Sequence, residues 1–272
     1  MSGIFDIYSN KFKEGIMAGS SGKVIMVIFI LSVVTLLLAI TALADSGAEY
    51  TIIKASVPPK IDGKLNDVIW KFTEPAVLGL INANGVKCKK KSNAYMVYDD
   101  NAIYVGFQRF DKDLGSILAN TKNRDGNVWE DDEFELFLDV DHDQSTYWQI
   151  AVNTNNAVWD CYNPGGGCDG VQNLKSDPQT AVSLGAKEDW FAEIKIPLKD
   201  LDVKETPKAG TIWGLNFAGH VLSGIDEWVT WSDIGASFHV PTGFGIGIFS
   251  AKAAGVSPTG KLPFLWGLLK SY

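Results

Sequence analysis

The chain has 272 residues, a net charge of −8 and many aromatic residues: nine Trp, fourteen Phe and eight Tyr. Residues 1–45 contain three lysines and three carboxylates, so the whole negative charge lies downstream of them. This balance excludes nucleic acid as the expected partner, because phosphate binding needs a basic face.

The first predicted element is the uncharged run "VIMVIFILSVVTLLLAITALA", Val24 to Ala44. As a helix it is long enough to cross a bilayer about 30 Å thick. Lysines precede it, and "ALA" before Asp45 resembles a signal-peptidase site. Residues 1–45 are thus a cleaved signal peptide or a retained anchor, and both remain open. Either one places residues 46–272 outside the cytoplasm, secreted or at the cell surface, with membrane contact only through residues 24–44.

From Tyr50 onward, short segments alternate between apolar and polar residues, separated by turn sequences. Brief helical turns are expected at 65–70 and 198–203. We predict an all-β fold: an antiparallel β-sandwich of ten to eleven strands within residues 46–252, preceded by one hydrophobic N-terminal helix. The segments that read as strands are 51–57, 93–99, 102–110, 133–140, 147–153, 157–163, 180–186, 190–198, 212–222, 228–233 and 244–251.

The three cysteines fit an oxidising compartment. Cys161 and Cys168 flank the turn-rich segment "YNPGGG", whose ends are expected to approach closely enough for a disulfide. Two free thiols are the alternative. Cys88 lies in "KCKKK", which reads as a basic loop. The spacings contain no CxxC pair, so they do not favour a zinc or c-type haem site.

An acidic stretch, "NVWEDDEFELFLDVDHD", spans residues 127–143. Strand alternation turns Phe134, Leu136 and Leu138 toward a core and Glu133 and Glu135 to the other face, which is expected to be exposed or to line a cleft. A glycosidase needs two carboxyl groups across a cleft, one of them with a raised pKa. Neighbours on one strand do not supply that arrangement, so we do not predict an enzyme.

The same stretch ends in three acids at alternate positions, Asp139, Asp141 and Asp143. Oxygen-binding cations such as calcium accept this spacing, although the glycine and the distal glutamate of an EF-hand loop are missing. A solvated hairpin turn is the alternative reading. Calcium is the one cofactor that the sequence suggests.

The order of the motifs resembles that of family 9 carbohydrate-binding modules and their relatives, over roughly residues 52–250. The resemblance rests on "PPKIDGKLNDVIW" (58–70), "VWEDDEFELFLDVD" (128–141), "YWQIAVN", "WFAEIKIPLKDL" and "WVTWSD". It implies a β-sandwich, commonly with bound calcium, and no catalytic machinery. It also implies a sugar held between two aromatic rings, with a glutamate and an arginine bonded to its hydroxyl groups.

By this resemblance the two rings fall on Trp129 and Phe238, and the glutamate falls on Glu135. The expected arginine falls on Ala151, and an expected amide falls near Ala218. Arg109, Arg124 and Gln149 are the residues considered as replacements. Trp70, Trp190 and Trp213 are expected in the core.

The predicted function is a non-catalytic, extracytoplasmic carbohydrate-binding module whose partner is a glycan or polysaccharide. One alternative is a self-assembling structural subunit of an extracellular sheath, filament or surface layer, whose assembly can depend on calcium. It would polymerise through the apolar C-terminal tail, residues 253–272, and the other reading of that tail is that it packs back on the sandwich. A second alternative is a haem-binding electron-transfer domain with Met96 and His239 as axial ligands.

Overall fold

The computed structural model describes residues 47–81, 86–165, 173–185, 189–235 and 237–254. The predicted N-terminal helix and most of the C-terminal tail lie outside these residues. Within them, no helix has the length and apolar character needed to cross a membrane.

Twelve strands and five short 3₁₀ helices make up the described part, in agreement with the predicted all-β class. In chain order they are β1 (Glu49–Ala55), η1 (Val68–Phe72), β2 (Ala76–Ile81), β3 (Val86–Tyr98), β4 (Ala102–Phe110), η2 (Leu114–Ser116), η3 (Val128–Glu130), β5 (Glu133–Asp139), β6 (Tyr147–Asn153), β7 (Val158–Asn163), β8 (Gln179–Leu184), β9 (Asp189–Pro197), η4 (Leu198–Asp200), β10 (Ile212–Val221), β11 (Glu227–Thr230), η5 (Pro241–Gly243) and β12 (Gly245–Ala254).

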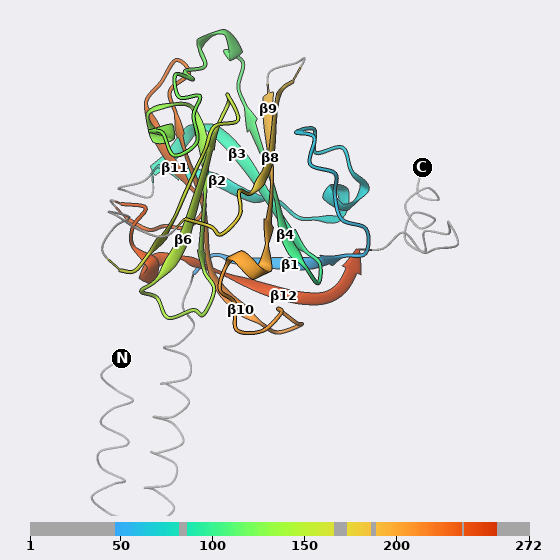
Figure 1. Cartoon of the computed structure of the whole chain (residues 1–272). Coiled ribbons are helices and arrows are strands. Elements are labelled where there is room, and N and C mark those ends of the chain that lie inside the picture. Colours follow the sequence, from blue (N-terminus) through green and yellow to red (C-terminus); the bar gives the residue numbers. More distant parts are fainter. Residues whose placement is uncertain (1–46, 82–85, 166–172, 186–188, 236, 255–272) are drawn as a thin grey trace, which may run out of the picture. The chain divides into compact units, whose positions relative to one another are not determined.

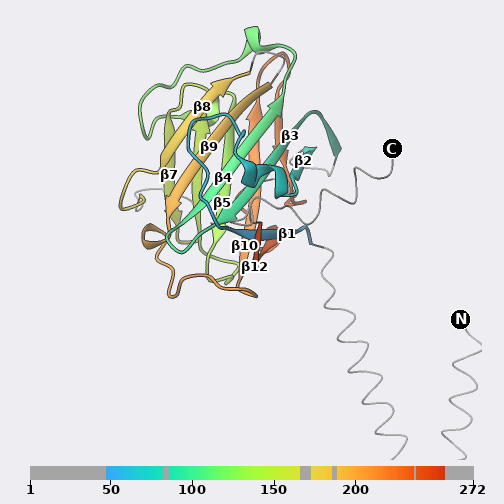
Figure 2. The same ribbon diagram turned by 90° about the vertical axis from the view of Figure 1, so that its right-hand side faces the viewer.

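The strands form two packed layers (Figures 1 and 2). Layer A contains β7, β6, β5 and β10, and layer B contains β8, β9, β4 and β3, in these orders. Strands β11 and β2 join the layers along one side, as do β12 and β1, so that all twelve strands form one continuous, folded sheet. Nearly all pairs are antiparallel, but β1 pairs in parallel with β12 and β3.

The core lies between the two layers and follows the alternation of the strands. Phe134, Leu136 and Leu138 of β5 point into it, as predicted. Trp190 and Trp213 also lie in this core, and Trp70 is buried in a second cluster on the outer face of layer B, so all three are core residues.

The opening segment, residues 58–72, covers the outer face of layer B, and Glu193 of β9 is its anchor. The Glu193 carboxylate accepts hydrogen bonds from the backbone N–H groups of Asp62 (2.9 Å) and Gly63 (2.7 Å) and from Nε1 of Trp70 (2.9 Å). Gly63 has a φ of +76°, and a Cβ there would lie 2.9 Å from the Val182 carbonyl carbon. The Asp62–Gly63 pair and Trp70 of the opening motif therefore share one structural role, which is to donate hydrogen bonds to this single buried carboxylate.

The structure corrects the sequence prediction at β2 and at the start of β3. Residues 76–81 form a strand that was not predicted, and "KCKKK" is not a loop but part of the 13-residue β3. Its lysines Lys87, Lys89 and Lys91 are exposed, whereas Cys88 is buried and free.

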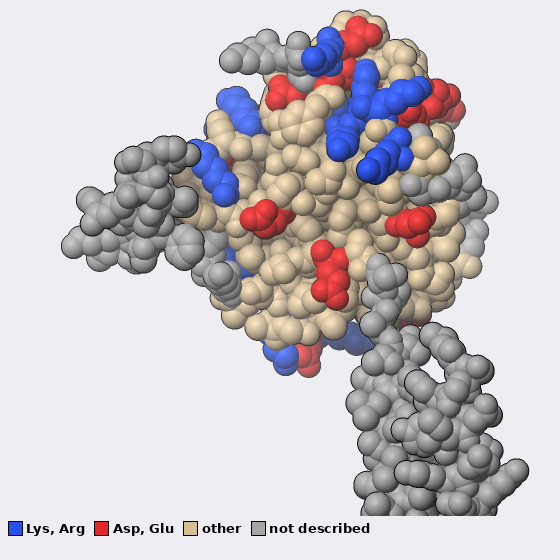
Figure 3. Space-filling model, turned by 180° about the vertical axis from the view of Figure 1, so that it is seen from behind, with Lys and Arg blue, Asp and Glu red and all other residues tan. Residues whose placement is uncertain are grey.

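On the face seen in Figure 3, most Lys and Arg side chains gather at one end, and the rest of that face carries only scattered charges.

Candidate ligand-binding face

The outer face of layer A carries the residues that the sequence singled out. The strand register aligns Trp159, Ala151, Glu135, Ala218 and Thr230 in one row across β7, β6, β5, β10 and β11. Glu135 is thus flanked directly by the two alanines that stand where polar contacts were expected.

Glu133 and Glu135 are buried, although their face was expected to be exposed or to line a cleft. Their exposed fractions are 0% and 2%. A roof of aromatic and aliphatic side chains covers part of the outer face by packing on Phe137, the next outward residue of β5. The roof residues are Tyr147, Trp228, Ile234, Phe238 and Phe244. The expectation of solvent exposure was wrong for both carboxyl groups. The roof could not be foreseen locally, because most of its residues lie about a hundred positions after Phe137.

Burial controls the charge of the two glutamates. Loss of hydration raises the pKa of Glu135 to about 7, and interactions with the Gln149 amide and with Glu133 offset part of this rise. Burial and the neighbouring Glu135 raise the pKa of Glu133 well above its ordinary value, against the opposing charge of Arg109. Both carboxyl groups therefore hold a proton more tightly than a solvated glutamate does.

The hydrogen bonds of the two carboxyl groups come from adjacent strands. Nε2 of Gln149, on β6, donates to Glu135, and the backbone N–H of His220, on β10, donates to Oε1 of Glu133 (2.6 Å). Oε2 of Glu133 is buried and has no hydrogen-bond partner among the described residues. One acceptor therefore remains unused on the floor of this face.

Trp129 stands at the entrance to β5, where 36% of it is exposed. Its ring meets that of Trp159 edge to face, with centroids 5.5 Å apart and planes 82° apart. Nδ1 of His220 donates to the Trp129 carbonyl (2.8 Å), and the His220 ring stacks on Trp228 at 3.8 Å. These contacts fix the loop that carries Trp129 against layer A.

Trp159 was not singled out from the sequence as a ligand contact. The signal was present, because alternation within 157–163 puts Trp159 on the same face as Glu135, but the strand order was needed to bring it beside Trp129.

Phe238, the second predicted ring, is buried, with an exposed fraction of 5%. It packs against Phe137 and Trp228, with centroid distances of 5.9 and 5.6 Å. The structure thus brings Trp129 and Glu135 to one face and places Phe238 inside the roof of that face.

The three residues considered as replacements for the missing polar contacts have different surroundings. Gln149 lies on the outer face and bonds Glu135. Arg109 is fully buried between the layers, where it donates to the carbonyl oxygens of His220 (2.7 Å) and Glu133 (3.1 Å). Arg124 pairs with Asp160 and Asp177. Only Gln149 is placed to act beside Glu135.

The predicted haem ligands do not come together. Met96 packs in the core between the layers, whereas His239 lies on the outer side of layer A, bonded to the Tyr147 hydroxyl (2.7 Å). This separation removes the pair of axial ligands that the haem hypothesis needed.

The three acids at the end of β5 do converge. One carboxylate oxygen from each of Asp139, Asp141 and Asp143 lies within 4.8 Å of the others. Asp139 is buried and accepts from the backbone N–H groups of Asp143 (3.1 Å) and Gln144 (2.8 Å). Three carboxylates at this spacing fit a calcium ion chemically, and calcium binding stays a prediction.

Cys161 is buried and disulfide-bonded, and its predicted partner Cys168 lies outside the described residues, so the pairing itself stays a prediction.

Known proteins resemble this chain in both sequence and fold. Endo-1,4-beta-xylanase A of Thermoanaerobacterium saccharolyticum is 28% identical over 212 residues, which are 74% of this chain and 16% of the enzyme. Exoglucanase XynX of Acetivibrio thermocellus is 26% identical over 208 residues, 73% of this chain and 17% of the enzyme. The chain thus spans about a sixth of these relatives.

Two solved structures share the fold. A family 9 carbohydrate-binding module of Caldicellulosiruptor kristjanssonii in complex with cellotriose has a TM-score of 0.54 and 19% identity, over 79% of this chain and 98% of that one. A putative carbohydrate-binding protein of Bacteroides uniformis has a TM-score of 0.59 and 18% identity, over 75% of this chain and all of that one. The sequence profile of the carbohydrate family 9 binding domain-like family matches residues 61–250, and the chain therefore belongs to that family.

Proposed function

We propose that the chain is a non-catalytic carbohydrate-binding module that acts outside the cytoplasm. Family membership supports this function, together with the ring of Trp129 against Trp159, which stands in the same row of outer-face residues as Glu135. The resemblance to a module that was solved with cellotriose, and to parts of a xylanase and an exoglucanase, suggests β-linked plant polysaccharides as the ligand class. The disulfide at Cys161 is in keeping with an oxidising compartment.

In this proposal the sugar stacks on the corner formed by Trp129 and Trp159. Sugar rings have apolar faces and hydroxyl edges, and an exposed indole is the side chain that offers the largest flat apolar surface to such a face. The two indoles meet at nearly a right angle, so a sugar ring can stack on the face of one and contact the edge of the other. This geometry is the observation that carries the proposal.

Glu135 and Gln149 supply the hydrogen bonds to the sugar hydroxyls. Glu135 is buried, so a sugar can reach its carboxyl group only when the side chains that cover it move. The sugar hydroxyls would then form hydrogen bonds with the carboxyl group, which has no access to water while it is covered. A sugar hydroxyl can both donate and accept, so it can pair with Glu135 in either protonation state.

Calorimetric titration tests the proposal on the full chain, kept in a mild detergent. The saccharide panel contains glucose, xylose, cellotriose and xylotriose. We expect binding to at least one of them, and we expect Trp129→Ala to weaken it by about tenfold or more, because the stacking surface is lost.

Phe72→Ala is the matched control, since Phe72 is an aromatic residue with 44% exposure on η1, on the other layer. Thermal melts should be similar for both variants, because neither side chain is buried. Equal affinity of the Trp129→Ala variant and the native chain would show that the sugar does not bind on this face.

The alternative of an extracellular assembly rests largely on the tail. Residues 255–272 lie outside the described part of the chain, so polymerisation through the tail remains a prediction.

A further inference from the structure

A cavity of about 500 Å³ opens at one end of the sandwich, away from Trp129. The end of β5, the start of β6, the end of β7 and the connection from η4 to β10 surround it. Because β5 is seven residues long, its two ends are about 20 Å apart. Trp129 precedes the start of β5 and the cavity lies at its end, so the cavity is separate from the proposed sugar-stacking corner.

The walls of the cavity are apolar and aromatic. Leu138, Trp148 and Trp213 line it from the core side, and Val203 and Tyr162 line it nearer to solvent. The ring centroids of Trp148 and Tyr162 are 5.2 Å apart, and the two ring planes are inclined at 55°. Flat, largely apolar walls of this kind are typical of ligand pockets between about 300 and 1,000 Å³.

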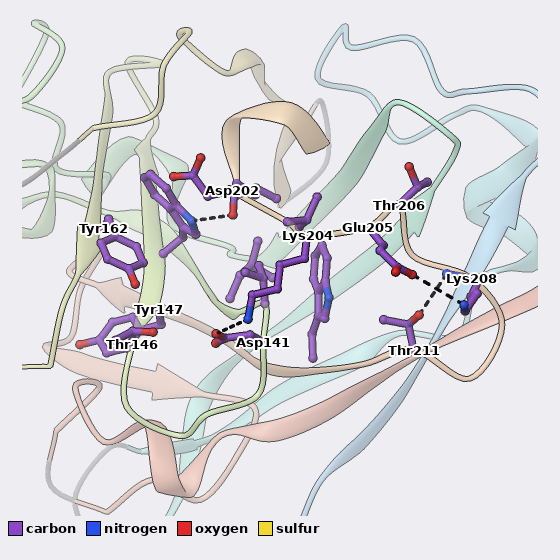
Figure 4. Close-up of a pocket in the computed structure, with 16 residues that line it drawn as sticks. Asp141, Thr146, Tyr147, Tyr162, Asp202, Lys204, Glu205, Thr206, Lys208 and Thr211 are labelled. Carbon is purple, nitrogen blue, oxygen red and sulfur yellow. Dashed lines mark hydrogen bonds and ion pairs between the residues drawn. The ribbon is translucent and has the colours of Figure 1, made fainter.

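The rim of the cavity is polar and offers both donors and acceptors. In Figure 4 the Lys204 side chain crosses the opening toward Asp141, with Tyr162 and Tyr147 on one side and Glu205, Thr206 and Lys208 on the other. Nζ of Lys204 is 3.9 Å from Oδ2 of Asp141, and the two side chains are 87% and 44% exposed. An exposed pair at this distance contributes little to stability, so a ligand can separate it at small cost.

The charges of the rim are already balanced within the protein. Lys208 lies 3.7 Å from Glu205, and Asp202 is paired with Lys175. A strongly charged ligand, such as a phosphate or a polycation, would find no concentration of opposite charge here. The cavity therefore suits a neutral ligand with apolar faces and many hydroxyl groups.

We propose that this cavity is a second binding site for a neutral saccharide, with the sugar faces against the partly buried Tyr162 and Val203 and the hydroxyl edge on Lys204 and Asp141. Neither Trp129 nor Glu135 lines the cavity, so it can bind a sugar without them, and Tyr147 is the one residue that belongs both to its lining and to the roof of the outer face.

The experiment measures binding of the saccharide panel described above to the full chain carrying Trp129→Ala. We expect binding to at least one saccharide to persist in this variant. Adding Lys204→Met should weaken that remaining binding by roughly tenfold, because it removes a charged donor and keeps the apolar stem. Lys199→Met, at an exposed lysine on η4 that does not line the cavity, is the control and should change nothing.

A second pair of variants tests the volume of the cavity. Thr206→Trp places a bulky ring in the opening and should abolish the remaining binding, whereas Thr206→Ala should leave it intact. Thr206 is exposed, so the thermal melts of both variants should match that of the native chain.

The outcomes separate the two sites. If the native chain binds saccharide and the Trp129→Ala variant binds none, the cavity proposal is overturned and the outer-face site stands. If binding persists but neither Lys204→Met nor Thr206→Trp affects it, the cavity proposal is likewise overturned. If Trp129→Ala has no effect and the cavity variants abolish binding, the cavity is the sugar site and the outer-face proposal fails. If nothing in the panel binds to the native chain, both proposals fail.

Discussion

The two layers of the sandwich each bury glutamate on their outer face, but with different partners. On layer B, Glu193 lies beneath the opening segment and accepts three hydrogen bonds from it, two from backbone N–H groups and one from Trp70. On layer A, Glu133 and Glu135 lie beside one another, and the hydrogen bonds that they accept come from the neighbouring strands β10 and β6.

This difference separates a structural carboxylate from a candidate functional one. The segment over Glu193 is tied to the carboxylate itself, so lifting it would leave three donors and one charge without partners. The roof over Glu135 is held by aromatic packing around Phe137. Lifting this roof would leave the hydrogen bonds of Glu133 and Glu135 in place, because none of them comes from a roof residue. A buried glutamate is thus a candidate for ligand contact only when its cover is not also its hydrogen-bond partner.

The largest predicted effect is on stability, at Glu193. Replacing Glu193 with Leu removes the acceptor for two buried N–H groups and one partly buried N–H group, and we expect a loss of about 3–5 kcal/mol in the free energy of unfolding. Urea unfolding followed by tryptophan fluorescence measures it.

Glu193→Gln is the control, because its amide oxygen keeps one acceptor and should retain part of the stability. A loss below about 1 kcal/mol for Glu193→Leu would mean that water replaces the carboxylate and that the opening segment is not anchored there.

The contrast between the two layers also shows what the sequence could reveal. Alternation predicted the strands of layer A and the inward direction of Phe134, Leu136 and Leu138, because a strand's faces are encoded locally. It missed β2 and the start of β3. In β3 the exposed side chains of Lys87, Lys89 and Lys91 made an alternating strand resemble a charged loop.

The candidate site was less predictable than the fold. The resemblance placed Trp129 and Glu135 on one face, but it did not reveal the roof on Phe137, whose residues Ile234, Phe238 and Phe244 come about a hundred residues later in the chain. No local pattern states which loop will cover which strand. The hydrogen bond from Trp70 to Glu193 was hidden for the same reason, as 123 residues separate the two.

A smaller effect is predicted for the pH dependence of stability at Glu135. Its folded pKa of about 7 lies above the ordinary value of 4.5, so its proton is held more tightly in the folded chain. The resulting stabilisation is full below about pH 4.5 and is lost as the pH rises through 7. We expect the free energy of unfolding to fall by about 2–3 kcal/mol between pH 5 and pH 8 from this group.

Glu135→Gln isolates that contribution, because the amide is neutral at every pH and has nearly the same shape. The variant should show a flatter profile and should be more stable than the native chain at pH 8, as measured by urea unfolding at five pH values. Glu130→Gln, at an exposed carboxylate of η3, is the control and should leave the native profile unchanged. Parallel profiles for Glu135→Gln and the native chain would indicate that Glu135 is solvated, and would weaken the contrast with Glu193.

The smallest predicted effect concerns the three carboxylates at the turn after β5, of which Asp141 and Asp143 are exposed and Asp139 is buried. Calcium bound by Asp139, Asp141 and Asp143 would stabilise the folded chain by about 1 kcal/mol at 10 mM, given the millimolar affinity typical of extracellular sites. We expect the melting temperature to rise by about 2–4 °C. Magnesium should do less, because it demands a stricter geometry.

Asp141→Asn is the informative variant for this site, because Asp141 is exposed and its removal leaves the backbone contacts of Asp139 intact. It should abolish the calcium-dependent shift, whereas Asp233→Asn, at an exposed acid distant in sequence from this turn, should preserve it. A shift that survives Asp141→Asn would place the ion elsewhere. Calcium at this turn would also hold Asp141 away from Lys204, so the same titration repeated with saccharide would show whether the ion and the cavity at the end of the sandwich act on each other.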